Sequence, residues 1–310
     1  MSHLYFPTEI LECFCIDSFK NFGFSEDESK IITDVLLTSD KFGIESHGMQ
    51  RISRYHKGIQ KGLIKVDAVP EVIFETPVTA VLDAHDGMGQ LVAYKAMNMA
   101  IEKAKKSGIA IVSVRNSNHY GIAGYYATMC TAQDCIGITG TNARPSIAPT
   151  NGVENMLGTN PLTFGIPTDE EFPFVLDCAT SISQRGKIEY FARNGMPTPA
   201  GMVIGENGET LTDSQQILKD LTTGKAALAP IGGVGEGLAG YKGYGYATVV
   251  EILCAALQAG SFLKMLTGRD SEGNAIPYPL GHFFIAIDTE AFLGAESFKK
   301  TTGEILRELR

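Results

Sequence analysis

The sequence predicts an α/β fold, and three observations support this prediction. The chain of 310 residues is 44% hydrophobic and 20% charged, which is typical of a folded globular protein. Its first 60 residues show only helical patterns. From Val72 onward, short β-branched runs alternate with helical segments, which is the pattern of consecutive β-α-β units.

The N-terminal segment is expected to be helical. A first helix begins near Pro7, and a second opens with the capping box that Ser25 and Glu28 can form. Gly43 suits the position just after the second helix, because glycine adopts the left-handed conformation found there. A third helix is expected over about 48–59.

The remaining elements follow in order along the chain. Before residue 150 we expect strands at 80–84, 109–114 and 136–140, with helices over 94–108 and 122–133. After residue 150 we expect strands at 162–167, 172–177 and 283–288, and helices at 183–193, 248–260 and near 304–310. The glycine-rich stretch 231–247 is expected to lead into the helix at 248.

Composition excludes several classes of function. Lys and Arg number 26 against 35 Asp and Glu, a net charge of −9, so a basic nucleic-acid surface is not expected. No apolar run approaches the roughly 18 residues of a membrane helix, and the N-terminus lacks a basic leader. The six cysteines are scattered without zinc-ligand spacing, so we expect reduced thiols and no metal site. A cytoplasmic protein without membrane partners is therefore expected.

The first motif with chemical potential is ESHGMQRISRYHKG. On a helix, His47, Arg51 and Tyr55 would stand at successive i, i+4 positions and share one face. A histidine, a guanidinium fork and a phenol on one wall suit recognition of a carboxylate next to a carbonyl. The alternative is a solvated helix face with a locally satisfied His47.

The second motif is RNSNHYGIAGYY. His119 follows an apolar strand and precedes a helix, which places it at the carboxyl edge of the sheet, where α/β enzymes hold their ligands. A helix N-terminus disfavours imidazolium, so the ring would be neutral and able to accept a proton. The alternative is a loop histidine hydrogen-bonded to Asn116 or Asn118.

The glycine-rich stretch contains a third motif. Gly235, Gly237 and Gly240 spell G-x-G-x-x-G, but no clear strand precedes them and no acidic residue follows at the end of a second strand. A Rossmann site is therefore disfavoured. Backbone amides and Lys242 at a helix N-terminus could still bind a phosphate.

A fourth motif joins GTNPLTFGIP to FVLDCATS. Asn160 and Pro161 form a polar turn before a strand, and Asp177 ends the next one. Taken alone, this is ordinary turn chemistry. The chain contains no Walker A, GxSxG or HExxH sequence, so phosphoryl transfer, serine hydrolysis and zinc proteolysis lack their usual motifs.

The ordered motifs ESHGMQRISRY, NSNHYGIAGYY, GTNPLTFGIP, LDCATS and GYKGYGYA resemble the malate/L-lactate dehydrogenase family of NAD(P)-dependent oxidoreductases. The likeness spans roughly residues 5 to 300. It implies a non-Rossmann α/β fold with a mixed sheet, flanking helices and a helical N-terminal segment. It further implies a homodimer, a helical and substrate-side domain over 1–118 plus 290–310, and a cofactor-binding domain over 119–289.

The resemblance also implies roles for single residues. Ser46, Arg51 and Tyr55 match the substrate-binding motif of the family. His119 matches a histidine assigned as proton acceptor in some members, and His47 matches one assigned as proton donor in others, so the proton carrier stays open between them. The implied cofactor-binding residues are Asp177, Cys178, Ala179, Lys242 and Gly243.

The implied activity is hydride transfer between nicotinamide and a small 2-hydroxy or 2-oxo acid, with malate and oxaloacetate expected first. The alternatives are lactate, sulfolactate or another keto- or imino-acid substrate, or a catalytically silent protein that binds small acids. NAD is the expected cofactor, and NADP is also compatible. Ala143 replaces a cofactor-contacting serine of ureidoglycolate dehydrogenases, which disfavours that substrate. Family members usually continue past the position of Arg310, so either a tail is missing from this sequence or the site closes differently.

Overall fold

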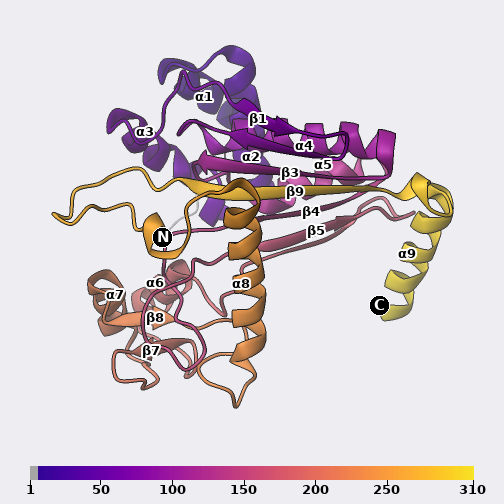
Figure 1. Cartoon of the computed structure of the whole chain (residues 1–310). Coiled ribbons are helices and arrows are strands. Elements are labelled where there is room, and N and C mark those ends of the chain that lie inside the picture. The colour runs from indigo at the N-terminus through magenta and orange to yellow at the C-terminus, as the bar shows by residue number, and fades with distance from the viewer. Residues whose placement is uncertain (1–5) are drawn as a thin grey trace.

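A computed structural model describes residues 6–310. Residues 1–5, the start of the N-terminal segment discussed above, lie outside the described residues. Its centre is a seven-stranded mixed sheet with the order β1-β2-β3-β9-β4-β5-β6 (Figure 1). The strands are β1 Glu71–Glu75, β2 Thr79–Asp83, β3 Ile109–Ser117, β4 Cys135–Thr141, β5 Leu162–Ile166, β6 Phe174–Cys178 and β9 Leu280–Asp288. The α/β class and the mixed sheet expected from the sequence are confirmed.

The strand next to β3 comes from far along the chain. β2 and β3 pair in parallel and are joined by α4 (Gly89–Ser107), as the alternating pattern predicts. β3 is followed by α5 (Ala123–Thr131) and then β4, but β3 and β4 are not neighbours. β9 lies between them and pairs antiparallel with both.

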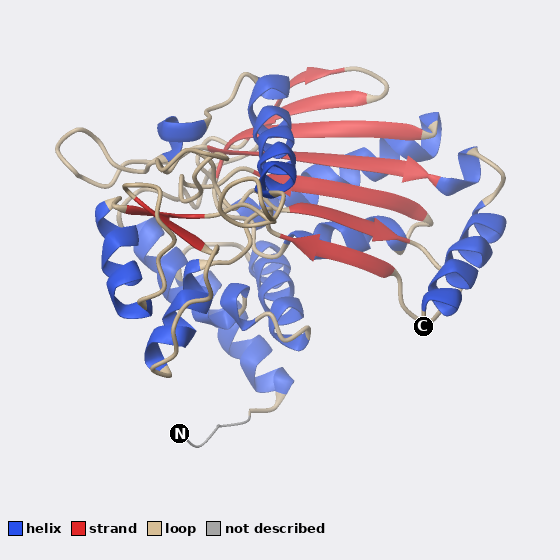
Figure 2. Ribbon diagram, turned by 90° about the horizontal axis from the view of Figure 1, so that it is seen from below, coloured by secondary structure: helices blue, strands red, loops and turns tan. Residues whose placement is uncertain are grey.

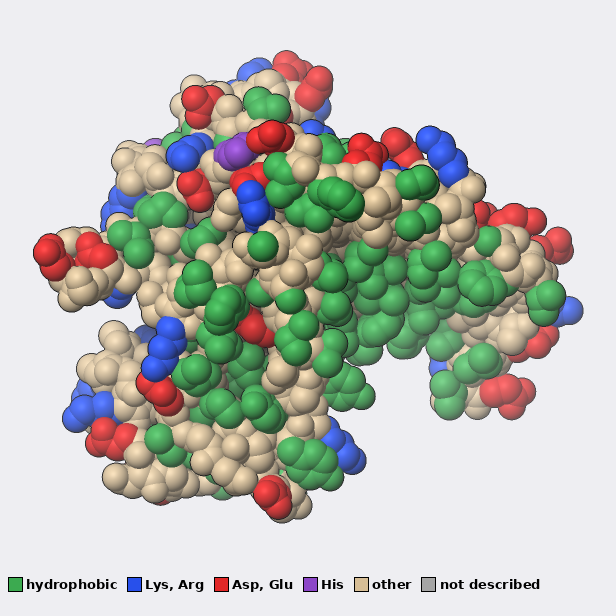
Figure 3. Space-filling view, viewed as in Figure 1, with side chains coloured by type: hydrophobic (Ala, Val, Ile, Leu, Met, Phe, Trp, Pro, Cys, Tyr) green, Lys and Arg blue, Asp and Glu red, His purple; other side chains and the backbone are tan. Residues whose placement is uncertain are grey.

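The two faces of this sheet differ in how they are covered. α4 and α5 pack on one face and form the main core with alternate strand residues such as Val112, Phe284 and Ala286, which are buried (Figure 2). On the opposite face Ile285 and Ile287 stay partly exposed. Figure 3 shows apolar side chains gathered over the hollow between α8 and α9, so this face is only partly covered.

The N-terminal helices agree with prediction except for the third. α1 spans Thr8–Asn21, and α2 spans Glu26–Lys41 with the predicted capping box formed by Ser25 and Glu28. The expected helix over 48–59 is replaced by η1 (Glu45–His47), η2 (Met49–Arg51) and α3 (Ile52–Gln60). Gly48 is extended between η1 and η2, and a Cβ there would lie 1.8 Å from a carboxylate oxygen of Asp40. The Asp40 carboxylate accepts the amide of Met49 at 2.8 Å, which fixes the break.

A smaller lobe contains a second core and the small sheet of β7 (Val203–Gly205) and β8 (Ala226–Leu228). Its helices are α6 (Arg185–Arg193) and α7 (Ser214–Thr223). Next to it, α8 (Gly240–Ala255) begins inside the glycine-rich stretch and not after it, so the predicted start at 248 is wrong. A Cβ at Gly243 would lie 2.4 Å from the backbone of Ile231, so glycine allows this helix to pack directly on another segment.

The chain ends in α9 (Ala295–Leu309), which begins earlier than the predicted tail helix near 304. Figure 1 shows α9 standing apart from the smaller lobe, and Arg307 pairs with Asp169 at 2.9 Å. The remaining short helices are η3 (Ala256–Gln258), η4 (Leu263–Leu266) and η5 (Thr289–Ala291). Within residues 6–310 no helix combines the length and apolar character needed to cross a bilayer. The predicted division near residue 118 stays a prediction, and the large sheet takes strands from both sides of it.

Candidate active site

A cleft of about 620 Å³ opens where β3 ends. Its walls are formed by η1, η2 and α3, the turn after β3, the loop at 143–146, the start of α6 and the segment 268–280 that leads into β9. The lining includes His47, Arg51, Tyr55 and His119, so four predicted residues from two distant motifs meet here. They meet although the single helix expected to hold three of them is broken at Gly48.

His119 has one ring nitrogen held inside the protein. The backbone amide of Gly121 donates to Nδ1 at 3.3 Å, and the Tyr55 hydroxyl lies 2.8 Å from the same atom. A backbone amide can only donate, so Nδ1 carries a lone pair and the Tyr55 hydroxyl donates to it as well. The neutral ring therefore carries its proton on Nε2, which makes no hydrogen bond within residues 6–310. The His119 ring thus offers an N–H donor to the cleft.

Burial and nearby cations keep this ring neutral. The pKa of His119 is held well below its usual value, first by burial and then by the charge of Arg54. Burial also raises the pKa of Tyr55 to about 12, so its hydroxyl stays protonated. Tyr55 is 1% exposed and lines the cleft, and its hydroxyl contacts His119. Its role in substrate binding stays a prediction.

His47 is held differently. Its Nδ1 lies 2.9 Å from the Ser46 hydroxyl, which can donate or accept, so either tautomer of the His47 ring is satisfied. Burial, followed by the charges of Arg51 and Arg54, lowers the pKa of His47 to about 4. The rings of His47 and His119 are stacked with centroids 5.3 Å apart. The proton of His119 thus has a fixed position on its ring, whereas the contacts of His47 allow either tautomer.

The cleft is cationic within an acidic protein. Among the described residues that line it, seven are Lys or Arg and none is Asp or Glu, namely Arg51, Arg54, Lys57, Lys61, Arg144, Arg185 and Arg269. Arg185 pairs with Glu189, whereas Arg51 donates from Nε to the backbone carbonyl of Ser46. A chain of net charge −9 that gathers cations in one cleft provides a site for a small anion.

The predicted cofactor residues do not line this cleft. Asp177 is the next-to-last residue of β6, and its carboxylate accepts the amide of Gly124 at 2.7 Å and the Thr163 hydroxyl at 2.9 Å. This carboxylate therefore lies at the N-terminus of α5, where negative charge is favourable. Cys178 and Ala179 follow it and are half-buried.

The other two predicted cofactor residues lie in the first turn of α8 behind the cleft wall. Thr159 lines the cleft, and its carbonyl accepts the amide of Thr180, next to Ala179. The Thr180 carbonyl in turn accepts the amide of Ile231 at 2.9 Å, against whose backbone Gly243 packs. Hydrogen bonds and backbone packing thus connect the LDCAT segment (176–180) and the KGYG segment (242–245) to each other and to the wall of the cleft. Lys242 is exposed at the start of the helix.

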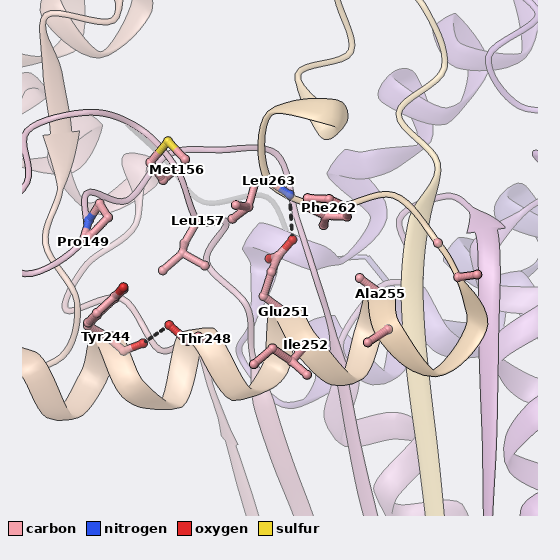
Figure 4. A pocket seen from close by; sticks show the side chains of 13 residues that line it. Pro149, Met156, Leu157, Tyr244, Thr248, Glu251, Ile252, Ala255, Phe262 and Leu263 are labelled. Atoms are coloured by element: carbon pink, nitrogen blue, oxygen red, sulfur yellow. Dashed lines mark hydrogen bonds between the residues drawn. The ribbon is translucent and has the colours of Figure 1, made fainter.

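A second cavity of about 450 Å³ lies along α8, and we call it the apolar pocket (Figure 4). Met156, Leu157, Ile252 and Phe262 are among its lining residues. Its one buried acid is Glu251, whose carboxylate accepts the side-chain amide of Asn160 and the backbone amide of Leu263, each at 2.8 Å.

Sequence reasoning missed three residues that line the cleft: Arg54, Arg144 and Tyr278. Arg54 stands three positions after Arg51, which is a helical spacing that could have included it. Arg144 directly follows Ala143, so its place next to a position compared with the family is a signal that could have included it. Tyr278 sits in a loop without any motif, so the sequence offers no signal for it.

Comparison with known proteins gives one consistent result. The family model described as malate/L-lactate dehydrogenase matches residues 6–310. The chain is 42% identical to a malate dehydrogenase of Pyrococcus abyssi over 100% of this chain and 83% of that protein. It is 38% identical to a malate/(S)-sulfolactate dehydrogenase of Methanothermus fervidus over 93% of this chain and 80% of the relative. A crystal structure of malate dehydrogenase from Entamoeba histolytica superposes with a TM-score of 0.94 at 40% identity, covering 100% of this chain and 85% of that one.

Proposed function

The chain belongs to the malate/L-lactate dehydrogenase family, and we propose that it is an NAD(P)-dependent dehydrogenase of small 2-hydroxy acids, with malate and oxaloacetate as its substrate pair. The observation that carries the proposal is the pairing of two stacked histidines with an excess of cations in one cleft. Cations bind the carboxylate of such an acid, and the histidines serve the oxygen on C2. The names of the Pyrococcus and Entamoeba relatives favour malate.

Arg51 is proposed to hold the C1 carboxylate, next to the reacting carbon. Its guanidinium lies in the same wall as His47, and one edge is fixed by the hydrogen bond from Nε to the Ser46 carbonyl. The other edge is left for a ligand, and a planar fork matches the two oxygens of a carboxylate. Ser46 is proposed to act through His47, whose Nδ1 its hydroxyl contacts.

The proton is proposed to move through His47, and His119 is proposed to hold the same substrate oxygen. In oxidation the C2 hydroxyl would give its proton to Nε2 of neutral His47, while the Nε2–H of His119 donates a hydrogen bond to that oxygen. The contacts of Nδ1 support this division, because two donors face that atom in His119 and oppose its protonation. In His47 the flexible Ser46 hydroxyl can accept an Nδ1–H.

The cofactor is proposed to be NAD, with NADP as the alternative. When bound, its nicotinamide takes the hydride that leaves C2. Lys242 and the amides at the start of α8 would hold phosphate oxygens, and Asp177, Cys178, Ala179 and Gly243 would shape the adjoining wall. One observation fits a polar ligand here: the Ser181 hydroxyl, next to this wall, is buried without a partner within the described part of the chain.

Assembly and location are also proposals. We propose a homodimer, supported by apolar side chains that stay exposed on β6, such as Leu176 at 44%. We propose a cytoplasmic location, supported by the six cysteines, all of which are free thiols and four of which are buried. The two-part division at residue 118, with a substrate side and a cofactor side, remains part of the same proposal.

The test is a substrate panel followed by the absorbance of the reduced nicotinamide. Malate, lactate, sulfolactate and ureidoglycolate would each be supplied with NAD and, separately, with NADP. We expect the largest kcat/KM for malate with NAD. Failure of all four acids with both cofactors would refute the proposal, and sedimentation of an active monomer would refute the dimer.

A further inference from the structure

A carboxylate outside the cleft holds the segment that carries His47 and Arg51. Asp40 is the next-to-last residue of α2, and it does not line the cleft. Its Oδ2 accepts the backbone amide of Met49 at 2.8 Å, and Met49 begins η2, between His47 and Arg51 in the chain. An amide at the start of a helical turn has no partner inside that turn, so the Asp40 side chain supplies the missing acceptor.

The same carboxylate lies directly against Gly48. A Cβ at this position would overlap both oxygens of Asp40. Gly48 has a φ of −84°, which does not by itself require glycine. The requirement for glycine therefore comes from the Asp40 carboxylate, which occupies the space of a side chain at the break between η1 and η2.

The protein keeps this charge at a cost. Burial raises the pKa of Asp40 above its usual value, the Met49 amide opposes this rise, and the Glu45 carboxylate adds to it. An acid in the last turn of a helix is also unfavourable with the helix dipole. Among the described residues no cation forms an ion pair with Asp40, so its side chain contributes little to α2 itself.

The break at Gly48 has a consequence for Arg51. In an unbroken helix the carbonyl of Ser46 would accept the amide of Gln50. In this structure the Ser46 carbonyl instead accepts a hydrogen bond from Nε of Arg51, which turns the guanidinium group towards the cleft. The Ser46 hydroxyl contacts Nδ1 of His47 from the same turn. The orientation of both cleft side chains thus depends on where the helix is interrupted.

We propose that Asp40 is a positioning residue, which fixes the break at Gly48 and thereby aims His47 and Arg51 at one substrate. Asp40 acts through these two side chains and does not touch the substrate itself. This inference rests on the proposed function, because it takes His47 and Arg51 as the groups that serve the acid.

The first experiment compares malate kinetics in the wild type, Asp40→Ala and Asp40→Asn. A displacement of about 1 Å in a reacting group can cost about a hundredfold, so kcat/KM should fall about ten- to a hundredfold in Asp40→Ala. The loss should appear both in kcat, through His47, and in KM for malate, through Arg51. Affinity for the reduced cofactor, followed by fluorescence, should not change. Asp40→Asn keeps an oxygen that can accept the Met49 amide and should restore most of the activity.

Asp34→Ala is the matched control. It removes from the same helix an acid that accepts the Tyr125 hydroxyl at 2.7 Å and lies outside the cleft. Both alanine variants lose one side-chain hydrogen bond of α2, but only Asp40→Ala should change malate kinetics. Equal kinetic losses in the two variants would show that Asp40 only stabilises the fold.

Gly48→Ala tests the contact from the other side. Its methyl group would displace the Asp40 carboxylate, so kcat/KM should fall as it does in Asp40→Ala. In the double variant the methyl group has room, so the second substitution should add little to the effect of the first. Such non-additivity measures the coupling of two residues in contact. Additive losses would refute the proposed contact.

Hydrogen exchange gives a readout that does not depend on turnover. Protection of the amides at 48–51 should fall in Asp40→Ala and persist in Asp40→Asn, while α2 stays protected in both. Unchanged exchange at 48–51 in Asp40→Ala would refute the positioning role. If the wild type turns over none of the acids, the proposed function fails, and hydrogen exchange alone then decides whether Asp40 fixes the break.

Discussion

The cationic cleft and the apolar pocket are cavities of similar size with opposite internal chemistry. In the apolar pocket the buried acid, Glu251, has both carboxylate oxygens satisfied by protein donors. In the cleft the Nε2–H of His119 makes no hydrogen bond, and the guanidinium groups of Arg54 and Arg144 form no ion pair, among the described residues. Buried or confined polar groups are normally satisfied, so unsatisfied ones that converge indicate a ligand. Convergent polar groups, and not apolar volume, are therefore what marks the cleft as the proposed active site.

Replacement of His119 should give the largest effect on turnover, and it tests directly whether the cleft is the active site. His119→Ala removes the proposed hydrogen-bond donor to the reacting oxygen, so kcat should fall by about 10² to 10⁴. Binding of reduced cofactor, followed by fluorescence, should persist. The matched change in the apolar pocket, Ile252→Val, should leave kcat unaltered. Near-normal turnover of His119→Ala would leave His47 as the sole catalytic histidine.

Arg51→Lys should give the next largest effect. The charge is kept, but an ammonium group cannot form two parallel hydrogen bonds to a carboxylate. Each lost bond is worth about 1.5–3 kcal/mol, so kcat/KM for malate should fall roughly ten- to a hundredfold. An unchanged value would make Arg51 an ordinary half-buried side chain. A loss confined to cofactor affinity would show that this wall binds the cofactor.

Glu251→Gln tests the apolar pocket and should affect stability more than turnover. The new amide brings an NH₂ group against Asn160 or Leu263, both of which are donors, so one buried contact is lost. The free energy of unfolding should fall by about 1–3 kcal/mol, while kcat changes little. Urea unfolding and steady-state kinetics on the same sample test both halves. A stable variant with impaired turnover would give the apolar pocket a catalytic role.

The smallest expected effect is on the pH dependence of stability, and it comes from a third histidine, His282. His282 is fully buried, with Nδ1 at 2.7 Å from the Thr141 hydroxyl, and burial lowers its pKa to about 3. In the unfolded chain the pKa of His282 is about 6.5. Below that pH the imidazole is protonated in the unfolded state but stays neutral in the folded state, which favours unfolding. Stability should be complete above pH 6.5 and should decline as the pH falls towards 3. Urea midpoints measured at several pH values should show a weaker decline in His282→Gln than in the wild type, and equal declines would refute the role of this ring.

The sequence predicted which segments form helices and strands better than it predicted the tertiary contacts between them. Periodicity and capping located α1, α2, α4 and α5, because these signals are local. The break at Gly48 depends on the Asp40 carboxylate from another helix, which no pattern around residue 48 contains. The motifs identified His47, Arg51 and His119, but Arg144 and Tyr278 reach the cleft from loops whose course is set by tertiary contacts.

The position of β9 has a consequence for how the protein is made. Its hydrogen bonds join residues near 285 to strands at 109–117 and 135–141. The strand at the middle of this sheet is therefore the last of its seven strands to leave the ribosome. Until then β3 and β4 each expose an unpaired edge, and such edges are prone to join other chains. Closure over this sequence separation is slow, because chain entropy is lost before the contacts form. Until β9 inserts, these two edges therefore remain open to pairing with other chains.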